Sequence, residues 1–295
     1  VMAAEKGWVN ENGAVHFVDS NGSYAKNEWK TSQGVSYYLD GEGNLAKNTW
    51  IDGTYYAGED GSMTKESWIY VDENEGSMKS GWYYLGRNGK VEKNDWKTIE
   101  KAKYCFDSDG RMRTGWHYEN GDIYYLGNGS EGYTRSGWYF LESNGKKRPA
   151  EGSISKDLVP DSENGKWYYF QSNGKARKGE NGVPKEAAID GRKYYFDENG
   201  VMLTGWQCVK EKAEPGDGTG ISRFVYLGGK EDGMLKGQWL ETSERPWDTK
   251  AWSTALNVQA VRKTNAEETA LMKKDGSRWF YLENNGSPLF LSADA

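Results

Sequence analysis

The stretch Gly115-Trp116-His117-Tyr118-Glu119-Asn120-Gly121-Asp122-Ile123-Tyr124-Tyr125-Leu126 is the unit from which this chain is built. A first strand begins at Trp116 and runs into Asn120-Gly121, the dipeptide that most readily supplies the two positive φ angles of a type I′ turn. A second strand carries paired tyrosines, which favour a half-buried pleated surface. The stretch therefore predicts a β-hairpin.

This pattern recurs along the chain, because an aromatic pair is followed by a polar turn ending in glycine twelve times. The turn glycines are Gly22, Gly43, Gly61, Gly76, Gly89, Gly110, Gly132, Gly145, Gly174, Gly200, Gly233 and Gly286. The Asp, Asn and Ser residues of these turns tolerate left-handed backbone and cap turns with their side chains. Internal repeats of this kind predict an all-β fold, an elongated β-hairpin solenoid of about twelve short repeats.

The composition agrees with a repeat array and excludes some functions. Of the 295 residues only 36% are hydrophobic, whereas 14 are Trp, 20 are Tyr and 38 are Gly. Aliphatic residues are too scarce for one thick core, so burial must come from aromatic rings spread along the chain. The net charge is −6 without a run of Lys or Arg, which argues against nucleic acid, since its phosphates need a positive groove. No apolar run approaches the roughly 18 residues that span a bilayer.

Nine of the turn glycines are followed by a tryptophan six or seven residues later. The shorter class mostly reads Gly-Trp, and the longer class often reads Lys-Asn-x-Trp, as at Lys26-Asn27-Glu28-Trp29. We interpret the extra residue as a β-bulge, because a plain slip would turn every side chain to the opposite face. Trp68, Trp82 and Trp96 are only 14 residues apart. These copies are expected to be single strands, with Trp82 leading its own copy.

The spacing of the repeats becomes irregular in the second half of the chain, where we predict insertions at 146–166, 210–222 and 241–269. The predicted organisation is an N-terminal segment (1–6), the repeat solenoid (7–240), an irregular insertion (241–270) and a terminal repeat with a cap (271–295). A helical turn after Asn265, and strand resuming before Asp275, are expected in the last part. Val1-Met2-Ala3-Ala4 fits the end of a signal peptide as well as an arbitrary start of the sequence.

The two cysteines, Cys105 and Cys208, belong to distant repeats. Repeats this far apart in a linear array do not touch. We therefore predict two free, packed thiols and no disulfide between them.

Two motifs resemble a known family: Trp-x-x-x-Asn-Gly-x-x-Tyr-Tyr-Leu and Tyr-Tyr-Phe-Asp-x-x-Gly-x-Met-x-Thr-Gly-Trp. On these motifs the chain resembles the cell-wall-binding, or choline-binding, repeat superfamily over residues 7–240 and 271–290. It is also similar to the glucan-binding repeats of streptococcal glucosyltransferases and to the C-terminal repeats of clostridial toxins. The resemblance implies stacked β-hairpins on a secreted or cell-surface protein of a Gram-positive bacterium.

The resemblance also implies choline sites made of three rings: the Gly-Trp tryptophan, a Trp just before Tyr-Tyr, and an aromatic residue of the following copy. Ring faces attract the quaternary ammonium through cation–π interaction. In six copies the position before the aromatic pair departs from this pattern, with Val15, Ser36, Thr54, Lys103, Ile123 and Lys193. Phe224, behind Trp206, fits it best, while Trp82 and Trp138 fill both positions at once and Trp167 follows a copy without its Trp. Most cages are therefore expected to be incomplete.

Aromatic platforms beside Asn, Asp and Lys also suit the apolar faces of sugar rings. The alternative interpretation is that these rings only fill the core between stacked copies. Alternation along a strand places the two tyrosines of a pair on opposite faces, so one ring of each pair is expected to face outward. The candidate ligand-binding residues are Trp29, Tyr37, Trp50, Tyr55, Trp116, Tyr124, Trp138, Trp167, Tyr194, Trp206 and Phe224.

Catalysis and metal binding have little support in the sequence. The two histidines, His16 and His117, occupy strand positions, and there is no zinc motif, nucleophile elbow or phosphate loop. Asp107-Ser108-Asp109-Gly110 resembles the start of a calcium loop but lacks the third ligand and the closing Glu, so it is predicted to be a repeat turn. We expect no enzyme, no cofactor and no metal.

The sequence therefore favours a non-catalytic, exported surface module that recognises carbohydrate or cell-wall polymer through repeated aromatic platforms. Choline binding stays open at a few sites and is not favoured as the general function. The second hypothesis is an adhesin for a host protein, since Trp and Tyr dominate interface hot spots. In that case the irregular insertions of the second half would form the contact surface.

Overall fold

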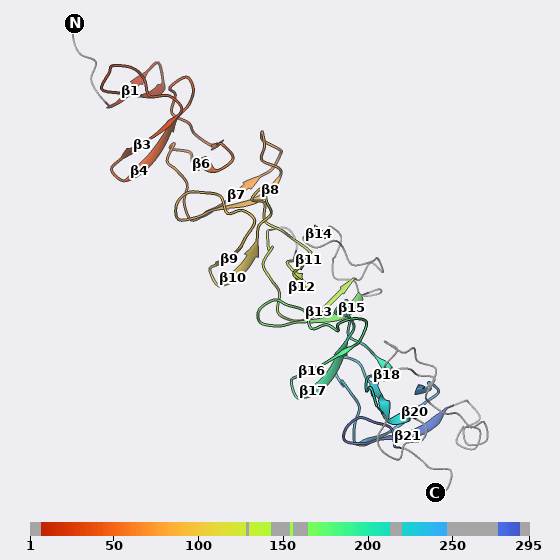
Figure 1. The fold of residues 1–295 in the computed structure, drawn as a ribbon. Coiled ribbons are helices and arrows are strands. Elements are labelled where there is room, and N and C mark those ends of the chain that lie inside the picture. The colour runs from red at the N-terminus through yellow and green to blue at the C-terminus, as the bar shows by residue number, and fades with distance from the viewer. Residues whose placement is uncertain are drawn as a thin grey trace. The chain divides into compact units, whose positions relative to one another are not determined.

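The computed structural model of the chain describes residues 7–127, 130–142, 154–155, 165–212, 220–246 and 277–289. Within them the chain forms two compact units, Val1–Thr114 with Asn128–Tyr133 (unit 1) and Gly115–Gly127 with Thr134–Ala295 (unit 2). Strands dominate both units, which confirms the all-β class (Figure 1). No helix in the described ranges is long and apolar enough to cross a membrane. The elongated shape of the whole chain stays a prediction.

Unit 1 consists of ten strands in chain order. These are β1 Gly7–Glu11, β2 Ala14–Val18, β3 Glu28–Ser32, β4 Val35–Leu39, β5 Thr49–Ile51, β6 Tyr55–Ala57, β7 Ser67–Val71, β8 Gly81–Leu85, β9 Trp96–Ile99 and β10 Ala102–Cys105. Each odd-numbered strand pairs antiparallel with the strand that follows it, which gives five successive hairpins.

Unit 2 continues the same order of hairpins. Its elements are β11 Trp116–Glu119, β12 Asp122–Tyr125, β13 Gly137–Glu142, β14 Ile154–Ser155, β15 Gly165–Phe170, β16 Lys185–Ile189, β17 Arg192–Phe196, β18 Gly205–Cys208, the 3-10 turn η1 Ile221–Arg223, β19 Phe224–Leu227, β20 Gln238–Thr242 and β21 Arg278–Leu282. β13 pairs with β15, while β14 adds a third strand to the β11–β12 hairpin. The described residues thus form ten hairpins, two fewer than the twelve turn glycines. The difference arises because Gly76 lies in the sequence between the paired strands β7 and β8, and Gly145 between the paired strands β13 and β15.

The turn that defines the repeat has the predicted backbone. Asn120 and Gly121 have φ angles of 50° and 79°, as a type I′ turn requires. The ladder between β11 and β12 runs in continuous register from Trp116↔Tyr125 to Glu119↔Asp122. The local prediction for this stretch is therefore confirmed.

The copies stack through one recurring contact between aromatic rings. The tryptophan of the first strand packs edge-on against the first ring of the next copy's aromatic pair, and the ring centroids lie 4.7–5.4 Å apart. The pairs are Trp8–Tyr37, Trp29–Tyr55, Trp50–Tyr83 and Trp68–Tyr104 in unit 1, and Trp116–Tyr168, Trp138–Tyr194 and Trp206–Phe280 in unit 2. Edge-on geometry is the favoured arrangement of aromatic pairs, so each hairpin is held by its neighbour.

The extra residue of the Lys-Asn-x-Trp copies does not form a bulge inside the ladder. Asn27 has a φ of 52° and lies just before β3, whose register with β4 is uninterrupted from Glu28↔Leu39 onward. In the Gly-Trp copies a glycine such as Gly115, with a φ of 71°, takes the left-handed conformation instead. One left-handed residue before the strand therefore turns the tryptophan inward in both classes.

The 14-residue spacing has a different origin from the one expected. Trp82 lies in β8 and pairs with Tyr70 of β7, so it belongs to the hairpin that Trp68 leads. The two strands are joined by the long segment 72–80. Likewise, β20 and β21 form one hairpin, which places residues 277–289 in the same copy as 238–242. The expectation of single-strand copies led by Trp82 was wrong, because the hairpin loop is longer rather than lost.

Cys105 and Cys208 are free, buried thiols, one in each unit. Burial raises the pKa of the Cys208 thiol to about 11. Both side chains act as small packed residues of their hairpins, as predicted.

The buried tyrosines predict that the fold is sensitive to alkali. Burial raises the pKa of eight tyrosine hydroxyls: Tyr38, Tyr56, Tyr83, Tyr84, Tyr125, Tyr194, Tyr195 and Tyr226. As pH rises through the ordinary tyrosine pKa of about 10, the unfolded chain loses these protons before the folded chain does, so the free energy of unfolding falls. Parallel titrations of tyrosinate absorbance and far-ultraviolet circular dichroism should show ionisation coinciding with unfolding. Full ionisation with retained structure would contradict this.

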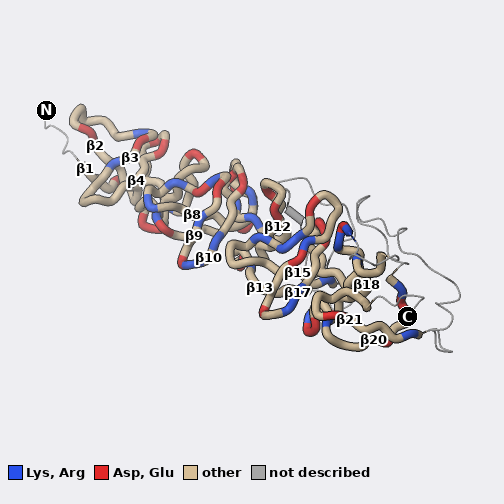
Figure 2. Tube along the Cα trace, turned by 60° about the horizontal axis from the view of Figure 1, so that its bottom comes forward, with Lys and Arg blue, Asp and Glu red and all other residues tan. Residues whose placement is uncertain are grey.

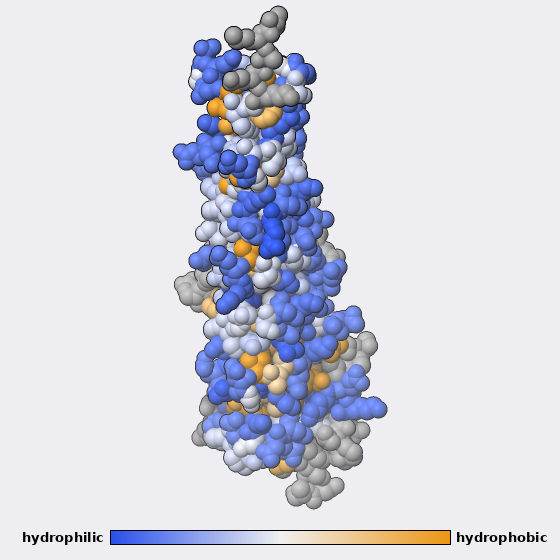
Figure 3. Space-filling model, turned by 90° about the vertical axis from the view of Figure 1, so that its left-hand side faces the viewer, coloured by the Kyte–Doolittle hydropathy of each residue, from blue (hydrophilic) through white to orange (hydrophobic). Residues whose placement is uncertain are grey.

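Charged residues of both signs are interspersed along each unit, without a stretch of one sign (Figure 2). On the face drawn in Figure 3, strongly hydrophobic residues form small separate patches on a mainly hydrophilic surface. A positive groove of the kind that nucleic acid needs is therefore not seen among the described residues.

Candidate aromatic-cage sites

The hairpin register explains how two rings of one copy meet. In each copy the first-strand tryptophan, here called the leading tryptophan, pairs with the second residue of the aromatic pair, as in Trp68↔Tyr84. The residue two positions earlier on the second strand, here called the diagonal residue, projects from the same face. A ring at the diagonal position therefore lies beside the leading tryptophan.

Unit 1 has one copy in which all three ring positions are filled. Trp68 leads, Trp82 is the diagonal residue, and Tyr104 comes from the following copy (the Trp68 site). The planes of Trp68 and Trp82 are perpendicular at 87°, with centroids 6.3 Å apart, and Tyr104 lies 4.8 Å from Trp68. All three side chains are half-buried, so part of each ring contacts solvent.

Unit 2 repeats this arrangement with Trp138, Trp167 and Tyr194 (the Trp138 site). Trp138 and Trp167 also meet at 87°, with centroids 6.2 Å apart, and Tyr194 lies 4.8 Å from Trp138. Trp138 therefore does not fill two positions at once, and Trp167 does not follow a copy without its Trp. The two residues belong to one hairpin, because Trp138 pairs with Tyr169 of the strand that carries Trp167.

A third tryptophan pair lies in the last described hairpin. Trp239 and Trp279 have the same leading and diagonal positions, with centroids 6.5 Å apart and planes at 84°. These are among the most exposed large apolar side chains described, at 63% and 49%. Sequence reasoning missed this pair together with Trp68, Trp82 and Tyr104. The available signal was three consecutive aromatic residues, as in Trp279-Phe280-Tyr281 and Trp82-Tyr83-Tyr84.

The remaining copies lack a second ring at the surface. In six of these seven copies the diagonal residue is the one expected from the sequence: Val15, Ser36, Thr54 (directly before β6), Lys103, Ile123 and Lys193. The Lys103 ammonium lies 4.8 Å from the centroid of Trp96, so this copy places a cation of its own on the ring. In the copy without a tryptophan, Glu186 takes the leading position, where it accepts a hydrogen bond from the Tyr195 hydroxyl at 2.9 Å.

Most of the predicted ligand residues are found in the contacts between copies. Trp29 and Trp50 are half-buried against the aromatic pairs of their own and the next copy. The first rings of the pairs are in ring contact rather than free in solvent: Tyr37 and Tyr55 are half-buried, and Tyr124 and Tyr194 are buried. The expectation that one ring of each pair faces outward is therefore wrong.

Trp116 and Trp206 are also buried, and Phe224 is fully buried beneath the β18–β19 hairpin. The copy that seemed most complete in the sequence thus has its rings inside a hydrophobic cluster with Ile221 and Phe280. The sequence pattern identified the positions but not their accessibility, because accessibility depends on packing against residues of the next hairpin, such as Phe280.

The insertions proposed for a host-protein contact fall mostly outside the described residues, as do Trp247, Trp252, the helical turn at Asn265 and the strand start before Asp275. So does the N-terminal segment 1–6 with its signal-peptide interpretation. The predicted boundaries at 240 and 270 stay predictions.

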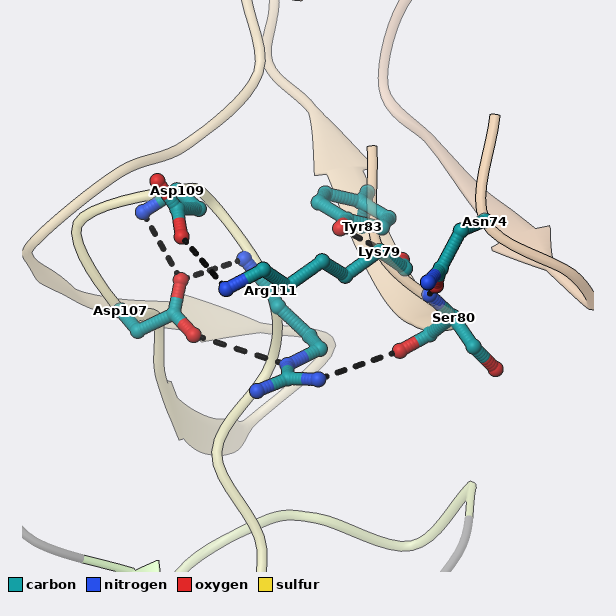
Figure 4. A network of polar contacts seen from close by, with 7 residues as sticks. All are labelled: Asn74, Lys79, Ser80, Tyr83, Asp107, Asp109 and Arg111. Atoms are coloured by element: carbon teal, nitrogen blue, oxygen red, sulfur yellow. Dashed lines mark hydrogen bonds and ion pairs between the residues drawn. The ribbon is translucent and has the colours of Figure 1, made fainter. Parts of the chain in front are cut away.

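The Asp107 turn belongs to a network of polar contacts with the segment that precedes β8 (Figure 4). The Asp107 carboxylate accepts the backbone N–H groups of Asp109 and Arg111, each at 2.9 Å, and also pairs with the Arg111 guanidinium at 3.6 Å. The Lys79 ammonium lies 3.9 Å from the Asp109 carboxylate. The turn carboxylates thus act as turn caps and ion-pair partners. Among the described residues no group of three or more potential ligands is arranged for a metal.

The histidines lie in the packing and not at an open site. His16 Nδ1 lies 2.7 Å from the Gly43 carbonyl oxygen, and its ring stacks on Tyr24 at 4.1 Å. His117 is almost completely buried, with Nε2 3.9 Å from the Glu119 carboxylate. Neither forms part of an exposed acid–base pair.

Comparison with known proteins matches the chain to one kind of repeat. Family models described as choline-binding repeats match residues 23–62 and 93–138. A third, described as a putative cell wall binding repeat, matches residues 6–24, 162–176, 188–202 and 273–287. Together the matches cover about half of the chain. No curated protein sequence matches.

Several solved structures are similar. Choline binding protein F from Streptococcus pneumoniae is 26% identical over 68% of this chain and 58% of that chain, with a TM-score of 0.44. The modular autolysin LytC from Streptococcus pneumoniae, in complex with a synthetic peptidoglycan ligand, is 17% identical over 97% of this chain and 53% of that chain, with a TM-score of 0.49. The choline-binding domain of CbpL from Streptococcus pneumoniae is 28% identical over 68% of this chain and 98% of that domain, with a TM-score of 0.39.

The chain thus spans little more than half the length of the first two of these proteins. The matching repeats support a cell-wall- or choline-binding module. The chain belongs to the choline-binding repeat family of cell-wall-binding proteins.

Proposed function

We propose that this chain is a non-catalytic surface module that binds the choline groups of a cell-wall polymer, with the Trp68 site as its principal binding site. The observation that carries the proposal is the perpendicular pair Trp68–Trp82, closed on a third side by Tyr104. Repeats of this family are typical of secreted or cell-surface proteins, which supports an exported location.

The chemistry of this site suits a quaternary ammonium. The three half-buried rings offer the negative quadrupole potential that attracts a quaternary ammonium. Tyr70, which is 50% exposed, lies 5.0 Å from Trp82 and extends the aromatic surface beyond the cage. That extension suits the apolar face of a neighbouring sugar, so the carbohydrate and choline interpretations describe one polymer-binding surface.

Replacing Trp82 with threonine is expected to weaken choline binding at this site about twofold to thirtyfold, because each cation–π contact contributes about 0.5–2 kcal/mol. Threonine is the natural diagonal residue of the preceding hairpin, Thr54, so the copy is expected to keep its fold. Isothermal titration with choline, and retention on choline resin, measure the effect.

The matched control is Trp29→Tyr, which alters a leading tryptophan whose diagonal neighbour is Ser36 and not a ring. This variant should retain wild-type choline affinity. Equal losses in both variants would show that the Trp68 site is not special. Retention of the wild type on a glycan array but not on choline resin would favour a sugar ligand instead.

A further inference from the structure

The Trp138 site differs from the Trp68 site in the loop beside it. In eight copies a residue at the end of the second strand, or directly after it, forms a bridge to the residue six positions later, such as Phe196↔Met202. After β19 the corresponding bridge, Leu227↔Met234, spans seven positions. The longer loop begins with Gly228-Gly229 and carries Lys230. Lys230 precedes the turn glycine Gly233, whereas the lysines of two other turns, Lys90 and Lys175, directly follow the turn glycine.

The Lys230 ammonium occupies the mouth of the Trp138 site. Its Nζ lies 5.2 Å from the ring centroid of Trp167 and 5.9 Å from that of Trp138, within the range of cation–π attraction. The third ring of the site fixes the lysine's backbone, because the Tyr194 hydroxyl donates a hydrogen bond of 2.5 Å to the Lys230 carbonyl. The side chain is 26% exposed, so most of it lies against the rings.

A carboxylate completes the arrangement. Glu231 Oε1 lies 2.9 Å from the Lys230 ammonium, and this hydrogen-bonded ion pair holds the pKa of Glu231 below its usual value. A primary ammonium can donate a hydrogen bond to this carboxylate, whereas a quaternary ammonium has no N–H to donate. The local chemistry therefore favours the chain's own lysine over a choline group.

The two sites have nearly identical ring geometry but differ in their occupant. Among the described residues of unit 1, no Lys or Arg lies over Trp68 or Trp82, and the cation–ring contacts found there involve Phe17 and Trp96. The Trp96 contact, made by Lys103, shows a second lysine of this chain on a leading tryptophan. Occupation by an internal cation is thus a feature of particular copies.

We infer that Lys230 is a resident cation that competes with choline for the Trp138 site, so that this site is self-occupied. The inference rests on the proposed function. A ligand binds the Trp138 site only in the fraction of molecules in which Lys230 has left the rings, so the apparent dissociation constant is raised by the inverse of that fraction. Lys230 thereby sets how many of the complete cages act as choline sites.

The test removes the Trp68 site, so that choline binding at the Trp138 site is measured alone. In a Trp82→Thr background, choline binding is measured by isothermal titration with and without Lys230→Gln. Removal of the competing cation is expected to tighten binding at the Trp138 site about fivefold or more, since one desolvated cation–π contact contributes about 1 kcal/mol or more. Adding Trp167→Thr should abolish the gain.

The matched control is Lys236→Gln, which removes the same charge from an exposed lysine of the same unit. It should leave choline affinity unchanged, and an equal gain in this control would assign the effect to general electrostatics and overturn the inference. The Lys230→Arg variant keeps a cation at this position, so its Trp138 site should remain closed to choline.

The outcomes distinguish this inference from the proposed function. If Trp82→Thr weakens choline binding and Lys230→Gln changes nothing, the proposed function stands and the inference fails. If choline binding by the wild type does not depend on Trp82, but the Lys230→Gln variant gains choline binding that depends on Trp167, the inference stands. The assignment of the Trp68 site then fails. Absence of choline binding in every variant overturns both.

A second readout does not depend on affinity. The Lys230 ammonium lies within 6 Å of two ring centroids, so the resonances of the adjacent ε-protons should be shifted upfield in the free protein. Saturating choline in the Trp82→Thr background should return them toward the values of an exposed lysine. Unshifted resonances in the free protein would show that the lysine does not occupy the site.

Discussion

Tyr83→Ala is expected to lower the free energy of unfolding of unit 1 by about 3–5 kcal/mol, the range for removal of a large buried aromatic side chain. Tyr83 is fully buried, and its ring packs edge-on against Trp50 at 5.3 Å. It also belongs to the cluster of Val71, Met78 and Leu85 that closes the β7–β8 hairpin. The substitution therefore removes the contact between two copies as well as a core ring.

The conservative variant Tyr83→Phe separates packing from hydrogen bonding. The Tyr83 hydroxyl donates a hydrogen bond of 2.7 Å to the Lys79 carbonyl, which anchors the long loop between β7 and β8. Losing this bond alone should destabilise by about 1 kcal/mol. Urea denaturation and hydrogen exchange of the β7–β8 amides measure both effects. A loss below 1 kcal/mol in Tyr83→Ala would contradict the role of this ring in stacking.

Gly179→Ala is expected to destabilise unit 2 by about 3 kcal/mol, at the upper end of the usual range for overpacking. A Cβ at this position would lie 2.2 Å from the Val183 carbonyl oxygen and 3.1 Å from that of Phe196. These are backbone atoms, which cannot rotate away as a side chain can. The Gly179 N–H also donates to the Asp197 carbonyl at 2.8 Å, so relief by displacement breaks a hydrogen bond.

Gly229→Ala provides the matched control. It lies in the same unit, and a Cβ there would meet no atom within 4 Å. Its free energy of unfolding should stay within about 0.5 kcal/mol of the wild type. Hydrogen exchange should show lost protection in β16 and β17 for Gly179→Ala alone. Equal stability of the two variants would disprove the steric argument.

The local structure of this protein follows from short-range patterns. Asn120-Gly121 determines a type I′ turn because both residues accept positive φ, and the structure has that turn. The paired aromatics and polar turns likewise determine where strands begin and end. The free, buried cysteines follow from the distance between repeats in an array. These properties depend on residues close together in sequence.

The candidate site could be predicted only in part. Most leading tryptophans and diagonal residues were found at the correct ladder positions, including Ile123 and Lys103. The partner of each Trp was assigned by sequence distance, however, and this failed wherever a hairpin has a long loop. Trp68 and Trp82 were placed in different copies, and so were Trp138 and Trp167.

Sequence alone thus determined the hairpin, its turn and the repeating aromatic burial, because these are properties of a few adjacent residues. The tertiary structure decided which strands pair across long loops, which rings form a cage and which cage contains Lys230. The entropy of loop closure rises only slowly with length, so a two-residue turn and a loop many times longer can close the same ladder. The distinction lies in contacts between copies, and no local pattern records those contacts.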